Sequence, residues 1–305
     1  MDLAVKLNDE RPGLIIAYLF HTYLAARILG RLFRRIPVIS SLRAASQEKW
    51  RSILDRMTLP LTDYYVVPSE DTARFAREVL RVPEKKLRII PIGLDISWLR
   101  SPQVLRNQIR EQLGLLEQDF VIGCIARFHP VKDHGTLLQA FKELRESKEG
   151  KHAKLLLVGK GKGDMEVRAL TEKLGLLEHV VFAGFRRDLP EIYSAMDAAC
   201  YTSRKEGLGN AAVEALSVGL PVVATSAPGF TTYLRHEQNA LLAPVGDPHA
   251  VFRALARVIS EPELASKIAQ QASADALENY GLQACFTAYD ELIRELAGNR
   301  SRQDS

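Results

Sequence analysis

The chain has 305 residues, of which 47% are hydrophobic and 26% are charged, and its formal net charge is +4 at pH 7. This composition is typical of a globular protein and excludes a disordered chain, and the length suffices for two packed lobes. No run of 18 apolar residues occurs, and the apolar stretch at 13–20 lacks the basic start and cleavage site of a signal peptide. We therefore expect a soluble, cytoplasmic protein.

Four stretches in the first hundred residues are typical of buried strands, and each precedes a helical pattern or a linker. They cover residues 13–19, 36–42, 63–69 and 87–93. This alternation predicts a parallel sheet with helices between its strands. Four strands make a short lobe, so we expect its first strand to have an open edge, or another chain or a missing segment to cover that edge.

Positive charge is concentrated in this first lobe. Residues 1–100 hold 17 Lys and Arg against 11 Asp and Glu, a balance of +6, so the remainder, with 24 against 26, has a balance of −2. Part of the excess is a helical pattern in which Arg27, Arg31, Arg34 and Arg35 recur beside apolar residues. We interpret it either as a solvated helix face or as a peripheral contact with anionic lipid headgroups. No interleaved aromatic platform accompanies the charge, so nucleic-acid binding is not expected.

A second series of strands follows the turn-rich segment 93–107, where we place the boundary between the lobes. Six strand patterns alternate with helical ones and predict a complete doubly wound sheet. We divide the chain into a partial first lobe, a complete second lobe, and a C-terminal helix that returns toward the first lobe and ends in a frayed tail. These parts cover 1–100, 101–280 and 281–305, and the six strands cover 120–128, 153–161, 179–185, 197–203, 220–226 and 239–246.

Three cysteines, Cys124, Cys200 and Cys285, lie in apolar contexts at long spacing. Their number is odd and their spacing fits no metal-ligand pattern. We interpret them as reduced core thiols rather than catalytic ones, as expected for a cytoplasmic protein.

Cations and glycines follow two neighbouring strands of the second lobe. Arg127 ends one strand pattern and Lys132 lies in the loop after it, so the two could converge on a diphosphate, although surface solvation explains them equally well. Gly159 and Gly161 end the next strand and permit a close backbone approach. The spacing matches neither a dinucleotide fingerprint nor a P-loop, which disfavours a nicotinamide enzyme or a P-loop NTPase.

Two glutamates flank a predicted strand-to-helix crossover, which is where open α/β sheets bind ligands. The helix is predicted to begin at Gly209 or Asn210, where free backbone N–H groups would bind a phosphate. Glu206 precedes this point and Glu214 lies about one turn inside the helix, so each could accept hydrogen bonds from hydroxyls at one end of a ligand. A nucleotide sugar has this pattern of hydroxyls on both sides of a diphosphate. The alternative for Glu214 is an exposed acid on the helix face.

The order of these motifs resembles that of the retaining GT-B glycosyltransferases of family 4, also called group 1. The likeness extends over about residues 13–295. It is carried by "EGLGNAAVE" with the following "EALSVGLPVVAT", and by "ARFHPVKD", "LLLVGKGKG", "IIPIGLD" and "VVFAGFRRDLPEIYSAMDAACYTS". The resemblance implies an α/β fold of GT-B type with two Rossmann-like doubly wound lobes, the C-terminal one complete and the N-terminal one partial.

The resemblance also implies roles for single residues. Glu206 would contact the donor sugar near its reacting carbon, and Glu214 would hold the ribose hydroxyls. Arg127 and Lys132 would neutralise the leaving diphosphate. The remaining donor contacts would come from Gly159, Gly161, Gly184, Phe185, Arg186, Gly207, Leu208, Gly209 and Asn210.

The implied reaction is sugar transfer, with retained stereochemistry, to a glycan or lipid-linked acceptor in polysaccharide or glycolipid synthesis. The donor would be a nucleotide sugar, with UDP favoured, and neither a metal nor a further cofactor is expected because no paired-aspartate motif is found.

The first lobe departs from the family pattern, because nothing before Leu14 could form the usual opening strand and its glycine-rich loop. Three positions also differ: Ala17 replaces a common histidine, Ile92 an asparagine, and Thr232 a glutamate. The alternative hypothesis is therefore a weakly active or inactive module that binds a nucleotide sugar and works with a partner chain. A sugar-nucleotide epimerase on the same fold is a third candidate.

Overall fold

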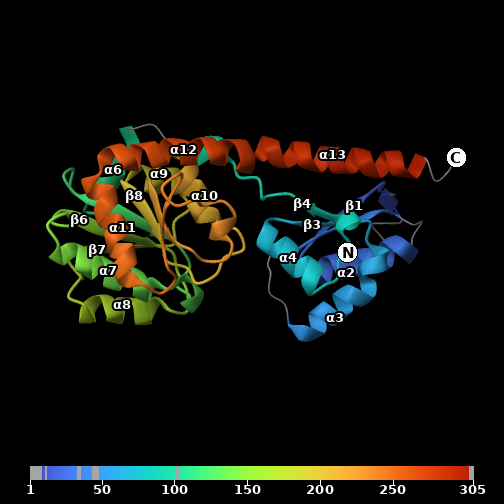
Figure 1. The fold of residues 1–305 in the computed structure, drawn as a ribbon, viewed down its shortest axis with the longest axis horizontal. Helices are drawn as coiled ribbons and strands as arrows, with labels where there is room; N and C mark the ends of the chain where they lie inside the picture. The colour runs from blue at the N-terminus through green and yellow to red at the C-terminus, as the bar shows by residue number, and fades with distance from the viewer. Residues whose placement is uncertain (1–8, 11, 33–35, 43–47, 100–103, 302–305) are drawn as a thin grey trace. The chain divides into compact units, whose positions relative to one another are not determined.

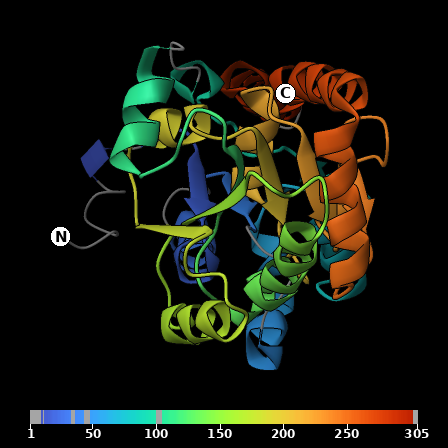
Figure 2. The same ribbon diagram turned by 90° about the vertical axis from the view of Figure 1, so that its left-hand side faces the viewer.

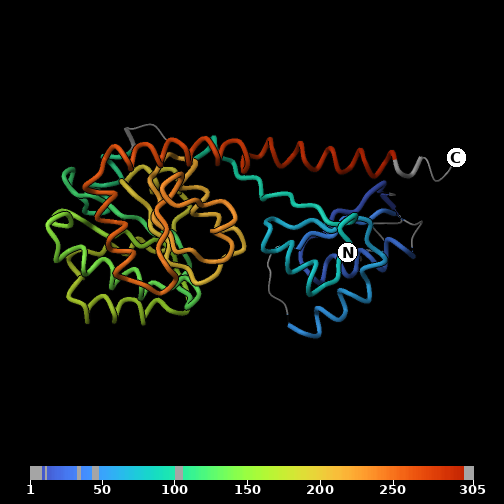
Figure 3. The backbone as a smooth tube through the Cα atoms, viewed as in Figure 1, coloured from blue at the N-terminus to red at the C-terminus, as the bar shows by residue number. Residues whose placement is uncertain are grey.

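The computed structural model describes residues 9–10, 12–32, 36–42, 48–99 and 104–301. The chain folds into two compact units (Figures 1 and 3). The first unit comprises Met1–Ile92 and Ala288–Ser305, and the second comprises Gly93–Thr287. Helix α13 (Leu282–Ser301) therefore contributes residues to both units.

The first unit contains a four-stranded parallel sheet, as the sequence predicts. Its strands are β1 (Ile15–Tyr18), β2 (Val38–Ser41), β3 (Tyr64–Val67) and β4 (Leu87–Ile89), and they follow one another in space in this order. The helices are α2 (Phe20–Leu32), α3 (Lys49–Thr58) and α4 (Glu70–Glu78), with short 3₁₀ turns η1 (Leu59–Leu61) and η2 (Glu84–Lys86). In the sheet built by the described residues β1 is an outer strand that pairs only with β2. Whether its outer edge is open or is covered by another chain or a further segment stays a prediction.

A buried charge network joins α2 and α3 in this unit. The Nη1 of Arg27 lies 2.6 Å from Oδ1 of Asp55, and its Nε donates to Oγ of Ser40 at 2.9 Å. The hydroxyls of Tyr23 and Tyr65 donate to the other oxygen of Asp55 at 2.6 and 2.7 Å. Arg27 is fully buried, so the prediction that it belongs to a basic surface was wrong. Its charge is neutralised inside the unit, as buried charges require.

The rest of the predicted basic face is only partly covered by the structure. Helix α2 ends at Leu32, and Arg31 is exposed in its last turn. Arg34 and Arg35 lie outside the described residues. Within the described part of the chain, every helix is too short or too polar to cross a bilayer.

The second unit is built on a six-stranded parallel sheet, which confirms the six predicted strands and the α/β fold. The chain crosses this sheet in both directions, so its helices cover both faces (Figures 1 and 2). The strands are β5 (Phe120–Ile125), β6 (Ala153–Val158), β7 (Val180–Gly184), β8 (Ala198–Tyr201), β9 (Val222–Thr225) and β10 (Leu241–Ala243), in the order β10-β9-β8-β5-β6-β7.

The helices of this unit also pack against one another. Helix α7 (His134–Glu146) packs against α11 (Pro248–Ser260) and α8 (Asp164–Lys173). Helix α12 (Pro262–Tyr280) packs against α10 (Asn210–Ser217) and also against α11. The remaining elements are α5 (Ile96–Leu99), α6 (Val104–Gln112), α9 (Leu189–Ser194), η3 (Pro130–Lys132) and η4 (Phe230–Thr232).

The direction of the chain across the second sheet reverses between β5 and β8. Crossovers from β5 lead to β6 and β7, and crossovers from β8 lead to β9 and β10. The two central strands pair in parallel, with Ile122 beside Ala198, so their carboxyl ends lie next to each other. Loops that leave such a switch point diverge and leave space for a ligand.

The three cysteines are free thiols, and two of them lie in the core of this sheet. Cys124 in β5 and Cys200 in β8 are buried, as predicted. Burial raises the pKa of Cys124 to about 12, so this thiol stays protonated at neutral pH. Cys285 is only partly buried, because it lies on α13 beside Gly93 rather than inside the sheet.

Candidate functional site

The loops after β5 and β8 bring Lys132 and Glu206 together at the switch point. Nζ of Lys132 donates to Oε1 of Glu206 at 2.5 Å, and the Ser203 hydroxyl donates to the same oxygen at 2.6 Å. The side chains of Lys132 and Glu206 are only 20% and 11% exposed. Within the described part of the chain no group hydrogen-bonds to Oε2 of Glu206. One carboxylate oxygen is therefore fixed and the other can accept a ligand hydroxyl.

Backbone hydrogen bonds connect the two loops. The amide of Arg204 donates to the carbonyl of Val131 at 2.8 Å, and the Thr202 hydroxyl donates to the carbonyl of Asp133 at 2.9 Å. Asp133 has a left-handed φ of 48°, a conformation that aspartate tolerates better than most residues. Its carboxylate accepts from Thr136 and from Arg204, which holds the start of α7 against the loop after β8. These contacts fix the separation of Lys132 and Glu206.

The backbone of Glu206 is held by a glycine that sequence reasoning did not assign to the site. The amide of Glu206 donates to the carbonyl of Pro228 at 2.9 Å. Gly229 follows with a φ of 94°, and a Cβ added to it would lie 2.5 Å from the carbonyl oxygen of Glu206. The Pro-Gly dipeptide after a strand signalled a turn. Only tertiary contact reveals that this turn supports Glu206.

Helix α10 begins at Asn210, which confirms the predicted onset. Gly209 is its N-cap with a φ of 83°, and a Cβ there would lie 2.5 Å from the Phe230 ring. Leu208 is buried, and its carbonyl accepts from the Tyr233 hydroxyl at 2.9 Å. These contacts with Phe230 and Tyr233 hold the turn from Gly207 to Asn210 in place. The first backbone amides of α10 follow directly after it.

Glu214 lies in the second turn of α10 and is partly buried. The Tyr193 hydroxyl lies 2.7 Å from Oε2 of Glu214 and 3.1 Å from the carbonyl of Ala211. Burial raises the pKa of Glu214, and the hydrogen bond from Tyr193 opposes this rise. The sequence did not predict the role of Tyr193, since its helix precedes β8 and only the fold brings it to α10.

Arg127 lies on the same loop as Lys132 but does not join the ion pair. Its side chain is exposed, and among the described residues it makes no hydrogen bond or ion pair. The arginine is therefore a free cation beside a partly neutralised lysine. Its contact with a diphosphate stays a prediction.

Gly159 and Gly161 have a structural explanation. A Cβ on Gly159 would lie 2.0 Å from the carbonyl oxygen of Ala126, and one on Gly161 would lie 2.1 Å from that of Phe128. Both glycines thus let the loop after β6 pack on the backbone that flanks Arg127. The close approach that the sequence indicated is confirmed for the backbone, whereas contact with a donor stays a prediction.

The segment predicted to lie against a nucleobase follows β7. Gly184 has a φ of 67°, and its carbonyl accepts from the amide of Gly159 at 2.7 Å. Phe185 is 61% exposed, so its ring is accessible to a stacking partner. Arg186 is paired with Asp188, and this pairing lowers the pKa of Asp188. The structure explains Arg186 as an ion-pair partner and leaves Phe185 as the better candidate for base contact.

No group of three or more His, Cys, Asp or Glu side chains is arranged to hold a metal ion in the ranges that the structure describes.

Two family models match the chain. Residues 106–275 match "Glycosyl transferases group 1", and residues 2–98 match "Glycosyltransferase Family 4". The matched ranges together include every residue assigned above to the candidate site.

Individual proteins show the same relationship. The chain is 30% identical over 233 residues to "Putative glycosyltransferase EpsD" of Bacillus subtilis, which covers 75% of this chain and 58% of EpsD. It is 28% identical over 208 residues to "Lipopolysaccharide core biosynthesis glycosyltransferase LpsD" of Rhizobium meliloti, which covers 65% of this chain and 59% of LpsD. The chain thus spans less than two thirds of the length of both relatives.

A solved structure shows the same fold. The Anabaena protein Alr3699/HepE, crystallised with UDP, superposes with a TM-score of 0.83 at 22% identity, covering 97% of this chain and 82% of HepE. The group 1 model alone covers more than half of the chain, including the switch point and the Glu206 loop. The chain belongs to the group 1 family of glycosyl transferases.

Proposed function

We propose that the chain is a retaining, metal-independent glycosyltransferase that moves a sugar from a nucleotide diphosphate sugar to a glycan or lipid-linked acceptor. UDP is the favoured donor base, because UDP is bound in the crystal of the similar HepE protein. Synthesis of a polysaccharide or glycolipid is the favoured setting, because LpsD is named for lipopolysaccharide core biosynthesis. We place the reaction in the cytoplasm.

The observation that carries the proposal is the arrangement of Lys132, Ser203 and Glu206. One oxygen of Glu206 is fixed by two donors, while the other is open. A lysine ammonium has three N–H donors, so Lys132 keeps two for phosphate oxygens while it holds Glu206. A cation and a hydroxyl acceptor thus lie side by side, as a sugar attached to a phosphate requires.

In the proposed reaction the bond between C1 of the donor sugar and the diphosphate oxygen breaks, and its electron pair stays on the diphosphate. Lys132, Arg127 and the first amides of α10 stabilise the negative charge that develops there. The acceptor hydroxyl forms the new bond to C1 on the same face, and the departing phosphate oxygen takes its proton. Glu206 binds the sugar hydroxyls near C1, and Glu214 binds the ribose.

The test is a calorimetric titration of the purified chain with UDP, GDP and their sugar conjugates, followed by an assay for released nucleotide with glycan and lipid-linked acceptors. Binding of UDP with release of nucleotide supports a transferase. Binding without release supports the alternative of a donor-binding module, and absence of binding contradicts both.

A further inference from the structure

A buried tyrosine holds the second glutamate of the site. Tyr193 on α9 is 2% exposed, and its hydroxyl lies 2.7 Å from Oε2 of Glu214 and 3.1 Å from the carbonyl oxygen of Ala211. The Tyr201 hydroxyl also donates to that carbonyl, at 2.7 Å. A phenol has one proton to donate, and a carboxylate is a stronger acceptor than a carbonyl. The proton of Tyr193 therefore goes to Glu214.

The two carboxylate oxygens of Glu214 differ as a result. Oε2 is bound by Tyr193, whereas no group among the described residues hydrogen-bonds to Oε1. Oε1 also keeps some exposed surface, because it is not one of the unpartnered atoms that the fold closes off from solvent. The oxygen that has no protein partner is thus the one that a ligand can reach.

The helix that carries Tyr193 is itself fixed at its C-terminal end. Nη1 of Arg106 donates to the carbonyl of the last residue of α9 at 2.6 Å, and Nε of Arg110 donates to the carbonyl of the C-cap at 3.0 Å. Both arginines also pair with Asp197. The last carbonyls of a helix have no partner within the helix, so these side chains satisfy them. Tyr193 therefore belongs to a fixed part of the unit.

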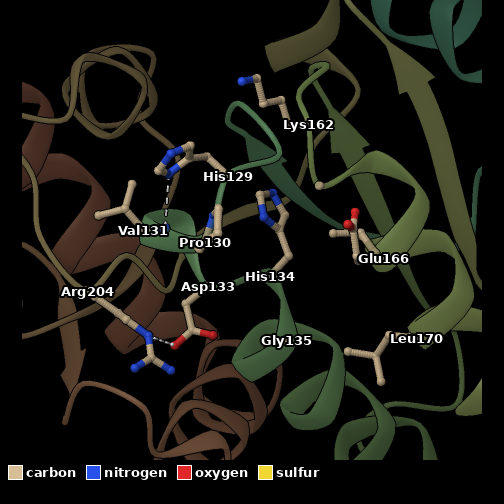
Figure 4. Close-up of a pocket in the computed structure, with 12 residues that line it drawn as sticks. His129, Pro130, Val131, Asp133, His134, Gly135, Lys162, Glu166, Leu170 and Arg204 are labelled. Atoms are coloured by element: carbon tan, nitrogen blue, oxygen red, sulfur yellow. Dashed lines mark hydrogen bonds and ion pairs between the residues drawn. The ribbon is translucent and has the colours of Figure 1, made fainter.

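The contact that supports the other loop of the switch point is more exposed. Figure 4 shows Arg204, from the loop after β8, turned toward Asp133 at the start of α7, and its Nε lies 3.0 Å from Oδ2 of Asp133. The Arg204 side chain is 62% exposed, so solvent and salt screen this pair. The hydrogen bond from Tyr193 is made by a buried hydroxyl, and such a bond is electrostatically stronger than one in water.

We infer that Tyr193 is a positioning residue that sets the preference for a ribonucleotide donor. Its hydroxyl holds Oε2 of Glu214, so that Oε1 is left for the ribose hydroxyls. Because Tyr193 acts through Glu214, this role rests on the ribose contact proposed above for Glu214. A carboxylate that is already oriented loses less conformational freedom when the ligand binds, so a residue that never touches the ligand can raise its affinity.

Tyr193 also affects the protonation of Glu214. Burial raises the pKa of Glu214, and the hydrogen bond from Tyr193 lowers it. The other titratable group that faces Glu214 is Tyr201 in β8, and burial raises the pKa of this phenol, so it stays neutral. In the part of the chain that the structure describes, α5, α12 and β9 also pack against α10 and place no charge that shifts the pKa of Glu214. Loss of the Tyr193 hydroxyl should therefore raise this pKa.

The test compares UDP with 2′,3′-dideoxy-UDP, which lacks both ribose hydroxyls, in calorimetric titrations of the parent and of Tyr193→Phe. In the parent we expect UDP to bind about tenfold more tightly than dideoxy-UDP, or better. In Tyr193→Phe this ratio of affinities should fall about threefold or more, while the affinity for dideoxy-UDP changes less than about twofold. Retained binding of dideoxy-UDP shows that the variant is folded and keeps its phosphate contacts.

The pH dependence of the same ratio separates positioning from a loss of packing. Both nucleotides carry the same base and diphosphate, so the titration of these groups cancels in the ratio. An ionised carboxylate accepts hydrogen bonds more strongly than a protonated one, so the ratio should rise with pH as Glu214 ionises. In Tyr193→Phe this rise should occur at a higher pH than in the parent, because the pKa of Glu214 is higher there.

Two further variants provide the controls. Tyr201→Phe removes a buried hydroxyl that donates to the same helix but not to Glu214, so it should keep the parent's ratio and the pH of its rise. In the background of Glu214→Ala, Tyr193→Phe should change the ratio no further, because the residue through which it acts is gone.

The inference is overturned if Tyr193→Phe keeps the parent's ratio, if the rise with pH does not move upward, or if Tyr201→Phe lowers the ratio equally. It is also overturned if Tyr193→Phe lowers the ratio in the Glu214→Ala background. In each of these cases the parent still prefers UDP, so the role proposed for Glu214 stands. A parent that binds both nucleotides equally overturns that role and the inference together, and a parent that binds neither contradicts the proposed function as well.

Discussion

Nζ of Lys132 and Oε1 of Glu206 lie 2.5 Å apart, although 74 residues separate them in the chain. The pair exists because β5 and β8 are neighbours at the point where the strand order reverses. It joins the residue proposed to bind phosphate to the residue proposed to bind the sugar. A change in either one therefore also alters the other, and predictions for the two must be separated by their readouts.

Replacement of Glu206 by glutamine tests the proposed contact with the sugar. The amide keeps the shape but loses the negative charge that Lys132 holds in place, so we expect kcat/KM for nucleotide-sugar turnover to fall about 10²-fold or more. Release of UDP measures the effect. Glu172→Gln, an exposed acid on α8, is the matched control and should retain the parent rate. A loss of only a few-fold at Glu206 would show that its assigned role is wrong.

Replacement of Lys132 by alanine tests the proposed contact with the diphosphate. If the ammonium binds the terminal phosphate, UDP affinity should fall about tenfold while UMP affinity changes little, because UMP lacks that phosphate. Calorimetry with both nucleotides measures the difference. Lys173→Ala, at an exposed position in α8, controls for the loss of one positive charge. Equal losses for UDP and UMP would instead assign Lys132 to the support of Glu206 alone.

The buried pair of Arg27 and Asp55 makes a prediction about stability. Arg27→Met leaves a buried carboxylate without its cation, which costs about 3–5 kcal/mol. Chemical denaturation should show this loss, whereas Arg31→Met, at an exposed position on the same helix, should change the free energy of unfolding by less than about 0.5 kcal/mol. Similar small effects in both variants would contradict the burial of Arg27.

The strands and the position of the site could be predicted from the sequence for one physical reason. Alternating strand and helix patterns force parallel pairing, and parallel pairing places all strand carboxyl ends at one edge. Arg127 ends one predicted strand, Lys132 lies in the loop after it, and Glu206 follows another predicted strand, so their shared edge was predictable. The helix start at Asn210 was predictable because a glycine-rich turn preceded an apolar helical pattern.

Other features depend on tertiary contacts that no local pattern records. Helical spacing placed Arg27 on a face of α2, but only Asp55 on another helix shows that this face is buried. Ser203 and Tyr193 support the two glutamates from positions that read as ordinary strand and helix residues. The fold alone brings these side chains to their partners.

The raised pKa of Glu214 predicts how stability changes with pH. A carboxyl whose pKa is raised above its ordinary value of 4.5 binds its proton more tightly in the folded state than in the unfolded state. Its contribution to the free energy of unfolding is therefore fully present below that ordinary pKa and is lost as pH rises through the folded pKa. Because glutamine cannot ionise, Glu214→Gln does not lose this stability as pH rises. We therefore expect the Tm of Glu214→Gln to rise relative to that of the parent between about pH 4 and about pH 8, as measured by calorimetric scans.

Glu263→Gln, at an exposed position on α12, is the control and should show no such rise in Tm. A parallel pH dependence of the parent and Glu214→Gln would mean that the fold does not penalise the ionised Glu214, and the site would then hold it as a carboxylate ready to accept the ribose hydroxyls.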